Sequence, residues 1–278
     1  MAEPDATKTI PLGSAPRPTT GDELAERVRS TIAEQAGGSG AVRVSASIDG
    51  ADIPSLELDL SGLVVPDSPP ASRRTAVRAR ERGVVAKLRV EAHPVTVDGV
   101  PLDVTAEAEN VPFSWVEGSD GSLAAELVEP TPEAPLVGTG RVAAPRTAVA
   151  AAVERRAAVL VAAQGLKLTK LDLDVTSQGP RAVTVAVRAQ LRKGILSATA
   201  TGGAHATIGD DLVLTLSDVT ATSGNPLVAA LLVAAKGRLQ ALEGRRIDLG
   251  AQLPRGVRIV DVQIEASADT LALTGRAG

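Results

Sequence analysis

The residues that could do acid–base or metal chemistry are few and far apart in this chain. Its two histidines are His93, which precedes a proline, and His205, which lies in TGGAHAT (201–207) without a nearby carboxylate. Because metal sites and acid–base pairs need several such groups held together, these histidines predict neither. The 278 residues include no cysteine, which excludes disulfides, thiolate zinc sites and cysteine nucleophiles. We therefore expect both histidines to be ordinary exposed or hydrogen-bonded residues.

Two short sequence patterns resemble motifs of known functional sites, a dinucleotide-binding fingerprint and a pair of carboxylates. GTGRVA (138–143) satisfies the G-x-G-x-x-A fingerprint of dinucleotide sites, but only Leu136 and Val137 precede it where a full strand is needed. Asp210–Asp211 lies in IGDDLV, where a turn is the better interpretation because adjacent strand residues point to opposite faces. Neither G-x-S-x-G nor S-x-x-K is present. We predict a protein that is not an enzyme, takes no cofactor and holds no metal.

The clearest charge cluster is the arginine run in SRRTAVRARERG (72–83). A run of like charges is most simply a solvated loop. The alternative is a surface that contacts anionic lipid headgroups, where each basic residue contributes about 1 kcal/mol. The arginines expected to make this contact are Arg73, Arg74, Arg78, Arg80 and Arg82.

NPLVAALLVAAKGRLQALEG (225–244) is the least polar stretch of the chain. Asn225 is a suitable N-cap, Pro226 is tolerated in a first helical turn, and Gly244 ends the pattern. The unbroken apolar part, 227–235, is too short to cross a bilayer, which needs about 20 apolar residues. The stretch therefore predicts a helix that begins in an apolar interior and becomes amphipathic toward its end.

Composition narrows the choice of partner. The chain is 44% hydrophobic, enough for a substantial core, and its net charge of −4 argues against nucleic acid. Phe113 and Trp115 are its only aromatic residues, so base-stacking platforms and aromatic cages are excluded. An interior of Val, Leu, Ile and Ala suits acyl chains.

The elements that must position these residues form two similar series. Residues 1–19 predict a disordered Pro/Thr-rich tail with no export signal, and Thr20–Glu23 predicts the capping box of a helix that ends near Gly37. Alternation predicts strands at 42–48, 56–60, 84–92 and 100–109, with 66–83 a loop or frayed helix. After a linker at 128–140 come a helix at 146–164 and strands near 166–177, 181–192, 195–208, 212–222, 245–250, 257–266 and 270–275.

Two segments share one pattern and predict an internal duplication. GLKLTKLDLDV (165–175) and GVRIVDVQIEA (256–266) have the same apolar spacing and the same one-residue phase slip, which is typical of a bulge or sharp bend. Chance similarity between two alternating strands is the alternative. We expect a first half at 20–135 and a second half at 136–278, each a helix with a curved antiparallel sheet.

The C-terminal segment RRIDLGAQLPRGVRIVDVQIEASADTLALTG (245–275) resembles the actinobacterial LmeA-like phospholipid-binding proteins, relatives of the tubular lipid-binding (BPI-like) superfamily. Two further segments resemble the same family more weakly: SLELDLSGLVV (55–65) and AHPVTVDGVPLDVTAEA (92–108). The resemblance implies an α+β fold: two pseudo-repeats of strongly curved antiparallel sheet wrapped round long helices, in an elongated tubular body with an apolar tube for acyl chains.

The expected function is to bind, or bind and transfer, a phospholipid or other fatty-acyl ligand, at a cytoplasmic location that includes the inner face of the membrane. An anionic membrane surface is the second expected partner, and nucleic acid is not one. The alternatives are a non-catalytic interaction or scaffold protein and, third, an enzyme on a lipid-like substrate. The side chains expected to line the lipid site are Leu227, Val228, Leu231, Leu232, Ala235, Val149, Val153 and Leu160.

Overall fold

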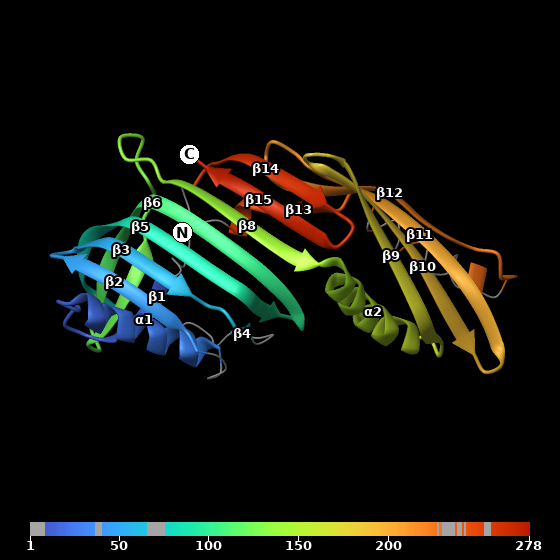
Figure 1. The fold of residues 1–278 in the computed structure, drawn as a ribbon, viewed down its shortest axis with the longest axis horizontal. Coiled ribbons are helices and arrows are strands. Elements are labelled where there is room, and N and C mark those ends of the chain that lie inside the picture. The colour runs from blue at the N-terminus through green and yellow to red at the C-terminus, as the bar shows by residue number, and fades with distance from the viewer. Residues whose placement is uncertain are drawn as a thin grey trace. The chain divides into compact units, whose positions relative to one another are not determined.

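The structure, a computed structural model, describes residues 9–36, 41–65, 76–226, 228–229, 237, 241, 243–252 and 257–278. Of these described residues, 62% lie in strands and 16% in helices. Two α-helices have both ends within the described residues: α1 (Gly21–Gln35) and α2 (Arg146–Ala162) (Figure 1). The expected α+β fold, with sheets wrapped round long helices, is therefore wrong. Strand pairing takes up most of the chain, because segments expected to be tails and loops extend into strands.

The larger sheet has ten strands, in the order β14-β15-β8-β6-β5-β3-β2, with β7 also paired to β6, β1 to β7 and β4 to β5. Strands β3 and β4 run parallel to β5. The strands are β1 (Thr9–Ser14), β2 (Arg43–Asp49), β3 (Asp52–Asp59), β4 (Val64–Val65), β5 (Val77–Val97), β6 (Val100–Gly118), β7 (Ser122–Leu127), β8 (Val137–Pro145), β14 (Ile259–Ala266) and β15 (Thr270–Ala277).

The smaller sheet has five strands in the order β13-β12-β11-β10-β9, and each strand pairs with its neighbours antiparallel. Its strands are β9 (Lys167–Gly179), β10 (Ala182–Lys193), β11 (Leu196–Ile208), β12 (Val213–Ser223) and β13 (Arg246–Asp248), followed by a 3-10 turn at Gly250–Gln252. These bounds agree closely with the strands predicted from alternation. The bulge predicted from the phase slip is present in β9, where Leu168 and Lys170 pair with adjacent residues of β10 and Thr169 is the extra residue.

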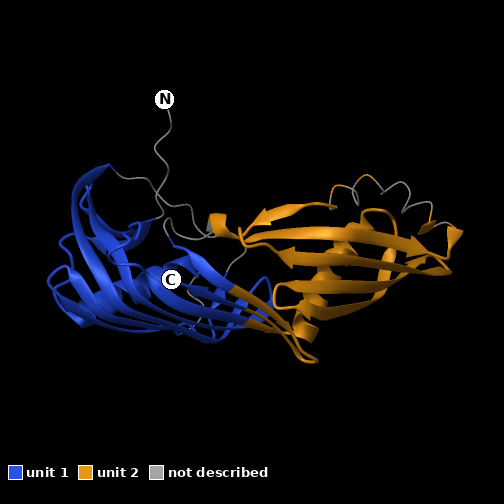
Figure 2. Ribbon diagram, turned by 90° about the horizontal axis from the view of Figure 1, so that it is seen from above, with its two compact units in different colours: residues 1–142, 253–261, 274–278 blue, residues 143–252, 262–273 orange. Residues whose placement is uncertain are grey.

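The chain forms two compact units. Unit 1 comprises residues 1–142, 253–261 and 274–278, and unit 2 comprises residues 143–252 and 262–273 (Figure 2). The first boundary falls within β8, seven residues beyond the predicted division at 135, and residues 253–261 and 274–278 of the predicted second half belong to unit 1. The predicted linker, 128–140, already contains the start of this strand.

Two predicted irregular segments are partly strand. Residues 9–14 of the expected disordered tail form β1, which pairs with β7 and buries Leu12 in the core. Residues 77–83 of the expected loop or frayed helix form the start of β5, which pairs with β6 from Val77 onward. In both cases the partner strand is distant in sequence, so local pattern did not reveal the pairing.

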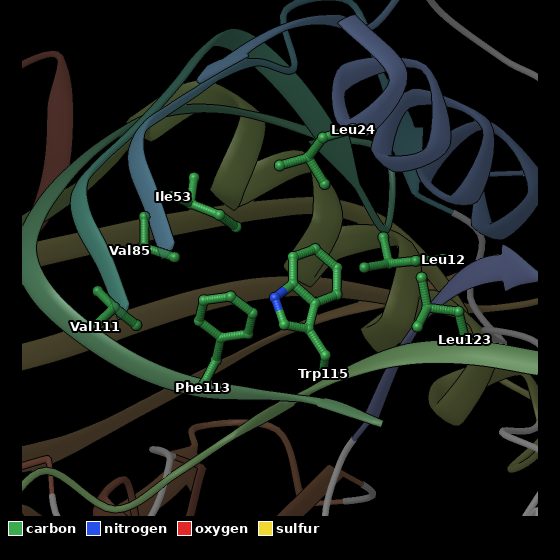
Figure 3. Packing of buried hydrophobic residues seen from close by; sticks show 8 residues of the cluster. All are labelled: Leu12, Leu24, Ile53, Val85, Val111, Phe113, Trp115 and Leu123. Atoms are coloured by element: carbon green, nitrogen blue, oxygen red, sulfur yellow. The ribbon is translucent and has the colours of Figure 1, made fainter. Parts of the chain in front are cut away.

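The core of unit 1 is the larger of the two. Its main cluster surrounds Phe113 and Trp115, whose rings meet edge to face at 5.1 Å between centroids (Figure 3). The indole N–H of Trp115 donates to the carbonyl of Ala51 over 2.9 Å, so the buried ring has no unmet donor. The other buried members are Leu12, Leu24, Ile53, Val85, Val111 and Leu123.

Candidate functional site

The candidate site is one face of the five-stranded sheet in unit 2. Residues paired across neighbouring strands lie on the same face, and here nearly all the paired residues are aliphatic or glycine. Val187, for example, pairs with Leu173 on one side and with Gly202 on the other. The exceptions are Ser177, opposite Val183, and Ser223, opposite Ala200. The face comprises Leu168, Leu171, Leu173 and Val175 of β9, Val183, Val185, Val187, Ala189 and Leu191 of β10, Ala198, Ala200, Gly202, Ala204 and Ala206 of β11, and Leu214, Leu216 and Ala221 of β12. We call it the apolar face.

The opposite face of the same sheet is polar. In β10 it carries Thr184, Arg188 and Gln190, and in β9 Lys170, Asp172 and Asp174. Threonines dominate the corresponding positions of β11 and β12. This clean division is typical of an antiparallel sheet with one face in water and the other against apolar material.

The apolar face is covered unevenly by the described residues. At one end Val175, Val183 and Ala206 are buried, and Ile264, Ala266 and Leu271 pack against their cluster. At the other end Leu191 is buried. The positions between them are only half-buried: Leu171, Leu173, Val185, Val187, Ala189, Ala200, Gly202, Ala204 and Ala221. Leu168 and Ala198, beside Leu191, and Leu214 and Leu216, at the Ala206 end, are half-buried as well. A contiguous aliphatic surface left half-exposed is a binding surface more often than an ordinary exterior.

Helix α2 packs along β9 and carries three of the predicted lipid-site residues (Figure 1). None of its residues is buried, although its sequence is largely Ala and Val. Val149 is half-buried, Val153 is 36% exposed and Leu160 is 71% exposed. The helix therefore leaves its apolar side chains available and does not close the apolar face.

The other predicted lipid-site residues belong to the 225–244 stretch. Leu227, Leu231, Leu232 and Ala235 lie outside the described residues. Val228 is buried, and its backbone N–H donates to the side-chain oxygen of Asn225 over 3.4 Å, as predicted for an N-cap. Sequence reasoning assigned the lining to helices alone and missed the apolar face, although the strict alternation of β9–β12 carries its signal.

The predicted headgroup arginines have partners of their own. Arg78 pairs with Glu117, and this carboxylate raises the pKa of the Arg78 guanidinium. Arg80 pairs with Glu126 at 2.9 Å, and Glu126 is itself buried. Arg82 is exposed, while Arg73 and Arg74 lie outside the described residues. Headgroup contact at these arginines stays a prediction, in which a phosphate must compete with the two glutamates.

Neither the histidines nor the GTGRVA and Asp210–Asp211 patterns form a catalytic or nucleotide site in the described residues. His93 Nδ1 lies 3.5 Å from Asp103, and His205 Nδ1 lies 3.3 Å from the Thr184 hydroxyl. GTGRVA lies inside β8, not at a strand-to-helix turn, and Asp211 closes the predicted turn by accepting from Val213 N–H. Within the described ranges, no group of three or more His, Cys, Asp or Glu side chains is placed to hold a metal ion.

Unit 1 has two shallow polar hollows, of about 270 and 370 Å³, that share Arg89 and Glu91 in their linings. Arg89 contacts Glu91 at 2.5 Å and Glu107 at 3.8 Å, and Glu91 is the main cause of its raised pKa. Arg43 pairs with Asp59 at 2.6 Å in the second hollow. These charges neutralise one another, so the hollows offer hydrogen bonds but no dominant charge for a ligand.

Comparisons with known protein families, with curated proteins and with solved structures found no match for this chain. The resemblance to LmeA-like proteins therefore stays a prediction. In the part of the chain that the structure describes, no helix has the length and apolar character needed to cross a bilayer.

Proposed function

We propose that this protein binds an acyl-chain lipid, such as a phospholipid, along the apolar face of unit 2. The observation that carries the proposal is the row of half-buried aliphatic side chains between the covered ends of that face. The proposal keeps the ligand class predicted from the sequence, but its site is an open sheet face beside α2 and not a tube wrapped round helices.

The chemistry of the face suits an acyl chain. Burying aliphatic surface is favourable by about 25 cal/mol per Å², and this attraction has no directional requirement. On β11 the face consists of small residues, Ala198, Ala200, Gly202 and Ala204, whereas the residues paired with them on β10 include Val185, Val187 and Leu191. Unit 2 contains no Phe, Trp or Tyr, so no large aromatic ring interrupts the surface.

The role is that of a binding protein and not of an enzyme. The apolar face carries no acid or base, and its two hydroxyls, Ser177 and Ser223, donate to the backbone carbonyls of Gly179 and Thr199. His205 belongs to the opposite face, paired with Thr184. A bound lipid would be held without being transformed.

The test uses two bulky substitutions on one strand. Ala189 is on the apolar face between Leu171 and Ala200, whereas Ala186 is on the polar face between Asp174 and Gly203. We expect Ala189→Phe to lower the lipid extracted per mole of protein, because the ring occupies part of the acyl-chain surface. Ala186→Phe changes the same residue type on the same strand and should leave bound lipid unchanged.

Thermal melting of the same samples separates a ligand surface from an ordinary core. In a tightly packed core, adding a ring costs about 1–3 kcal/mol, so Ala189→Phe would melt well below the parent. On a face that carries lipid, the variant should melt near the parent measured without lipid. If no lipid is recovered from the parent by solvent extraction or native mass spectrometry, and Ala189→Phe is strongly destabilised, the lipid proposal is wrong and an interaction protein is favoured.

A further inference from the structure

One end of the unit 2 sheet exposes large aliphatic side chains where folding does not need them. The β10–β11 hairpin turns through Gly194 and Ile195, and the last pair before the turn is Lys193 with Leu196. Ile195 is 94% exposed and Leu196 is 55% exposed. At the end of α2, Val159 and Leu160 are each 71% exposed. We call these four residues the apolar tip.

The two parts of the apolar tip lie at the same end of the sheet (Figure 1). After α2, a tight turn returns the chain to β9, with the Leu166 N–H donating to the Val161 carbonyl over 3.3 Å. Strand β9 then starts at Lys167, which pairs with Arg192 next to the hairpin turn. The end of α2, the start of β9 and the hairpin are therefore joined by short connections within unit 2.

The turn itself does not require an isoleucine. Gly194 has φ +60°, the left-handed conformation that glycine adopts without strain, and Ile195 is not in that region. A two-residue turn that starts with glycine is typically completed by Asn, Asp or Ser, which hydrogen-bond to water. A β-branched aliphatic side chain at the most exposed position of the hairpin thus adds nothing to the turn.

Basic residues surround the apolar tip. Lys167, Arg192 and Lys193 are all exposed and flank it on β9 and β10. No Asp or Glu occurs in residues 155–171 or 187–201, the segments at this end; the nearest carboxylate of β9, Asp172, pairs with Lys170. Among the described residues, no carboxylate pairs with Lys167 or Lys193. The charge here is opposite to the net charge of −4 of the whole chain.

We infer that the apolar tip docks unit 2 onto an anionic lipid bilayer, with Ile195, Leu196, Val159 and Leu160 entering the acyl region and the three basic residues contacting headgroup phosphates. Aliphatic side chains beside Lys and Arg match the layered chemistry of such a membrane surface. A protein partner is disfavoured because stable interfaces bury about 1,200–2,000 Å², more than four side chains provide. A second copy bound tip to tip is disfavoured because it would bring like charges together. This inference does not rest on lipid carriage by the apolar face.

The first experiment uses the absence of cysteine. Ile195→Cys in the full chain can be labelled at one site with an environment-sensitive fluorophore such as NBD, with Val260→Cys in β14 as the exposed control. On vesicles of phosphatidylcholine and phosphatidylglycerol in equal parts, the probe at 195 should brighten and shift to the blue, and the probe at 260 should not. On pure phosphatidylcholine vesicles the change at 195 should be much smaller.

The second experiment measures vesicle affinity by flotation. Ile195→Asn keeps a residue that suits the turn, and we expect it to weaken binding by about tenfold or more, since a buried aliphatic side chain is lost. Lys193→Gln should weaken binding by about fivefold. Val260→Asn and Lys87→Gln are the matched controls in exposed positions of β14 and β5, and both should bind as the parent does.

Several results would overturn the inference: no binding of the parent to anionic vesicles, an unchanged probe at 195, or equal losses in the tip variants and their controls. The outcomes also separate this inference from the proposed function. If the parent carries no extractable lipid, Ala189→Phe is strongly destabilised, and the parent still binds anionic vesicles through residue 195, lipid carriage is refuted and the tip inference is supported. If the parent carries lipid but the probe at 195 does not respond to vesicles, lipid carriage is supported and docking of the apolar tip is refuted.

Discussion

At the scale of single residues, the glycines of GTGRVA illustrate how a motif is explained by packing. Gly138 lies where β8 approaches β6, and a Cβ there would stand 2.7 Å from the Glu107 carbonyl oxygen and 3.2 Å from the Ala108 Cα. For Gly140 the nearest atoms would be 3.9 Å away. Only the first glycine is therefore required, and its requirement comes from strand packing and not from a phosphate.

This difference predicts opposite effects for two similar substitutions. Gly138→Ala should lower the free energy of unfolding by about 1–3 kcal/mol, because backbone atoms must move to admit the methyl group. Gly140→Ala should be neutral or stabilise by about 0.5 kcal/mol, since alanine restricts the unfolded chain and meets no clash. Urea denaturation of both variants tests the pair. Equal losses would refute the packing explanation.

We expect Asp59 to stabilise the folded protein by an amount that depends on pH. Hydrogen bonds from the Ser61 hydroxyl and backbone N–H, and then from Arg43, hold the pKa of the Asp59 carboxyl well below its ordinary value. Because the pKa is lower in the folded state, the stabilisation is present above the unfolded value of about 4 and disappears as the pH falls through the folded value. The parent should exceed Asp59→Asn in unfolding free energy near neutral pH, and the difference should narrow in acid. A difference that is constant with pH would contradict this origin.

At the scale of elements, α1 begins where its capping box predicts. The Thr20 side chain accepts from Glu23 N–H over 3.3 Å, and the Glu23 carboxylate accepts from Thr19 N–H over 3.1 Å. The first bond satisfies a donor that the first helical turn would leave unpaired, and the second holds the residue before the cap against the helix. The helix buries Leu24 in the core of unit 1, so its start position affects the whole unit.

Removing the N-cap side chain should cause a small loss of folding stability. Thr20→Ala removes the side-chain acceptor and should cost about 1 kcal/mol of stability. Thr19→Ala keeps the backbone N–H that Glu23 uses, so it is the control and should behave as the parent does. Denaturant midpoints of the two variants measure the difference, and a neutral Thr20→Ala would show that tertiary packing alone sets the start of α1.

At the scale of the whole molecule, the two units differ in the size of their cores. Unit 1 has a cluster of eight buried residues that includes both aromatic rings, whereas the buried cluster of the unit 2 sheet consists of Val175, Val183 and Ala206 among the described residues. Buried apolar area is the main stabilising contribution, so we expect unit 2 to be the less stable unit when no ligand is present.

Two probes can follow the units separately. Trp115 is the only tryptophan and lies in unit 1, so its emission reports that unit alone, while far-UV circular dichroism reports the strands of both. In urea, the dichroism signal should begin to fall at lower concentration than the Trp115 emission shifts. Added phospholipid should move only the earlier transition upward, because a ligand stabilises the state that binds it. Coincident transitions would show that the units unfold together.

The sequence by itself determined the local features of this protein. The cap at Thr20, the bounds of α2, the strands β9–β12, the bulge at Thr169 and the turn at Asp210–Asp211 all follow from periodicity and turn chemistry, which act over a few residues. Only the tertiary structure decided that Val77–Gly83 and Thr9–Ser14 are strands, since each is held by a partner distant in sequence.

Tertiary structure also decided where the apolar surface remains open. Alternation predicts that β9–β12 have an apolar face, but the degree of burial depends on what packs against it, and much of that face is only half-buried. The same holds for Ile195, whose exposure depends on its place at the end of the sheet. Which side chains face outward is a local property of the chain, whereas what covers them is a property of long-range contacts.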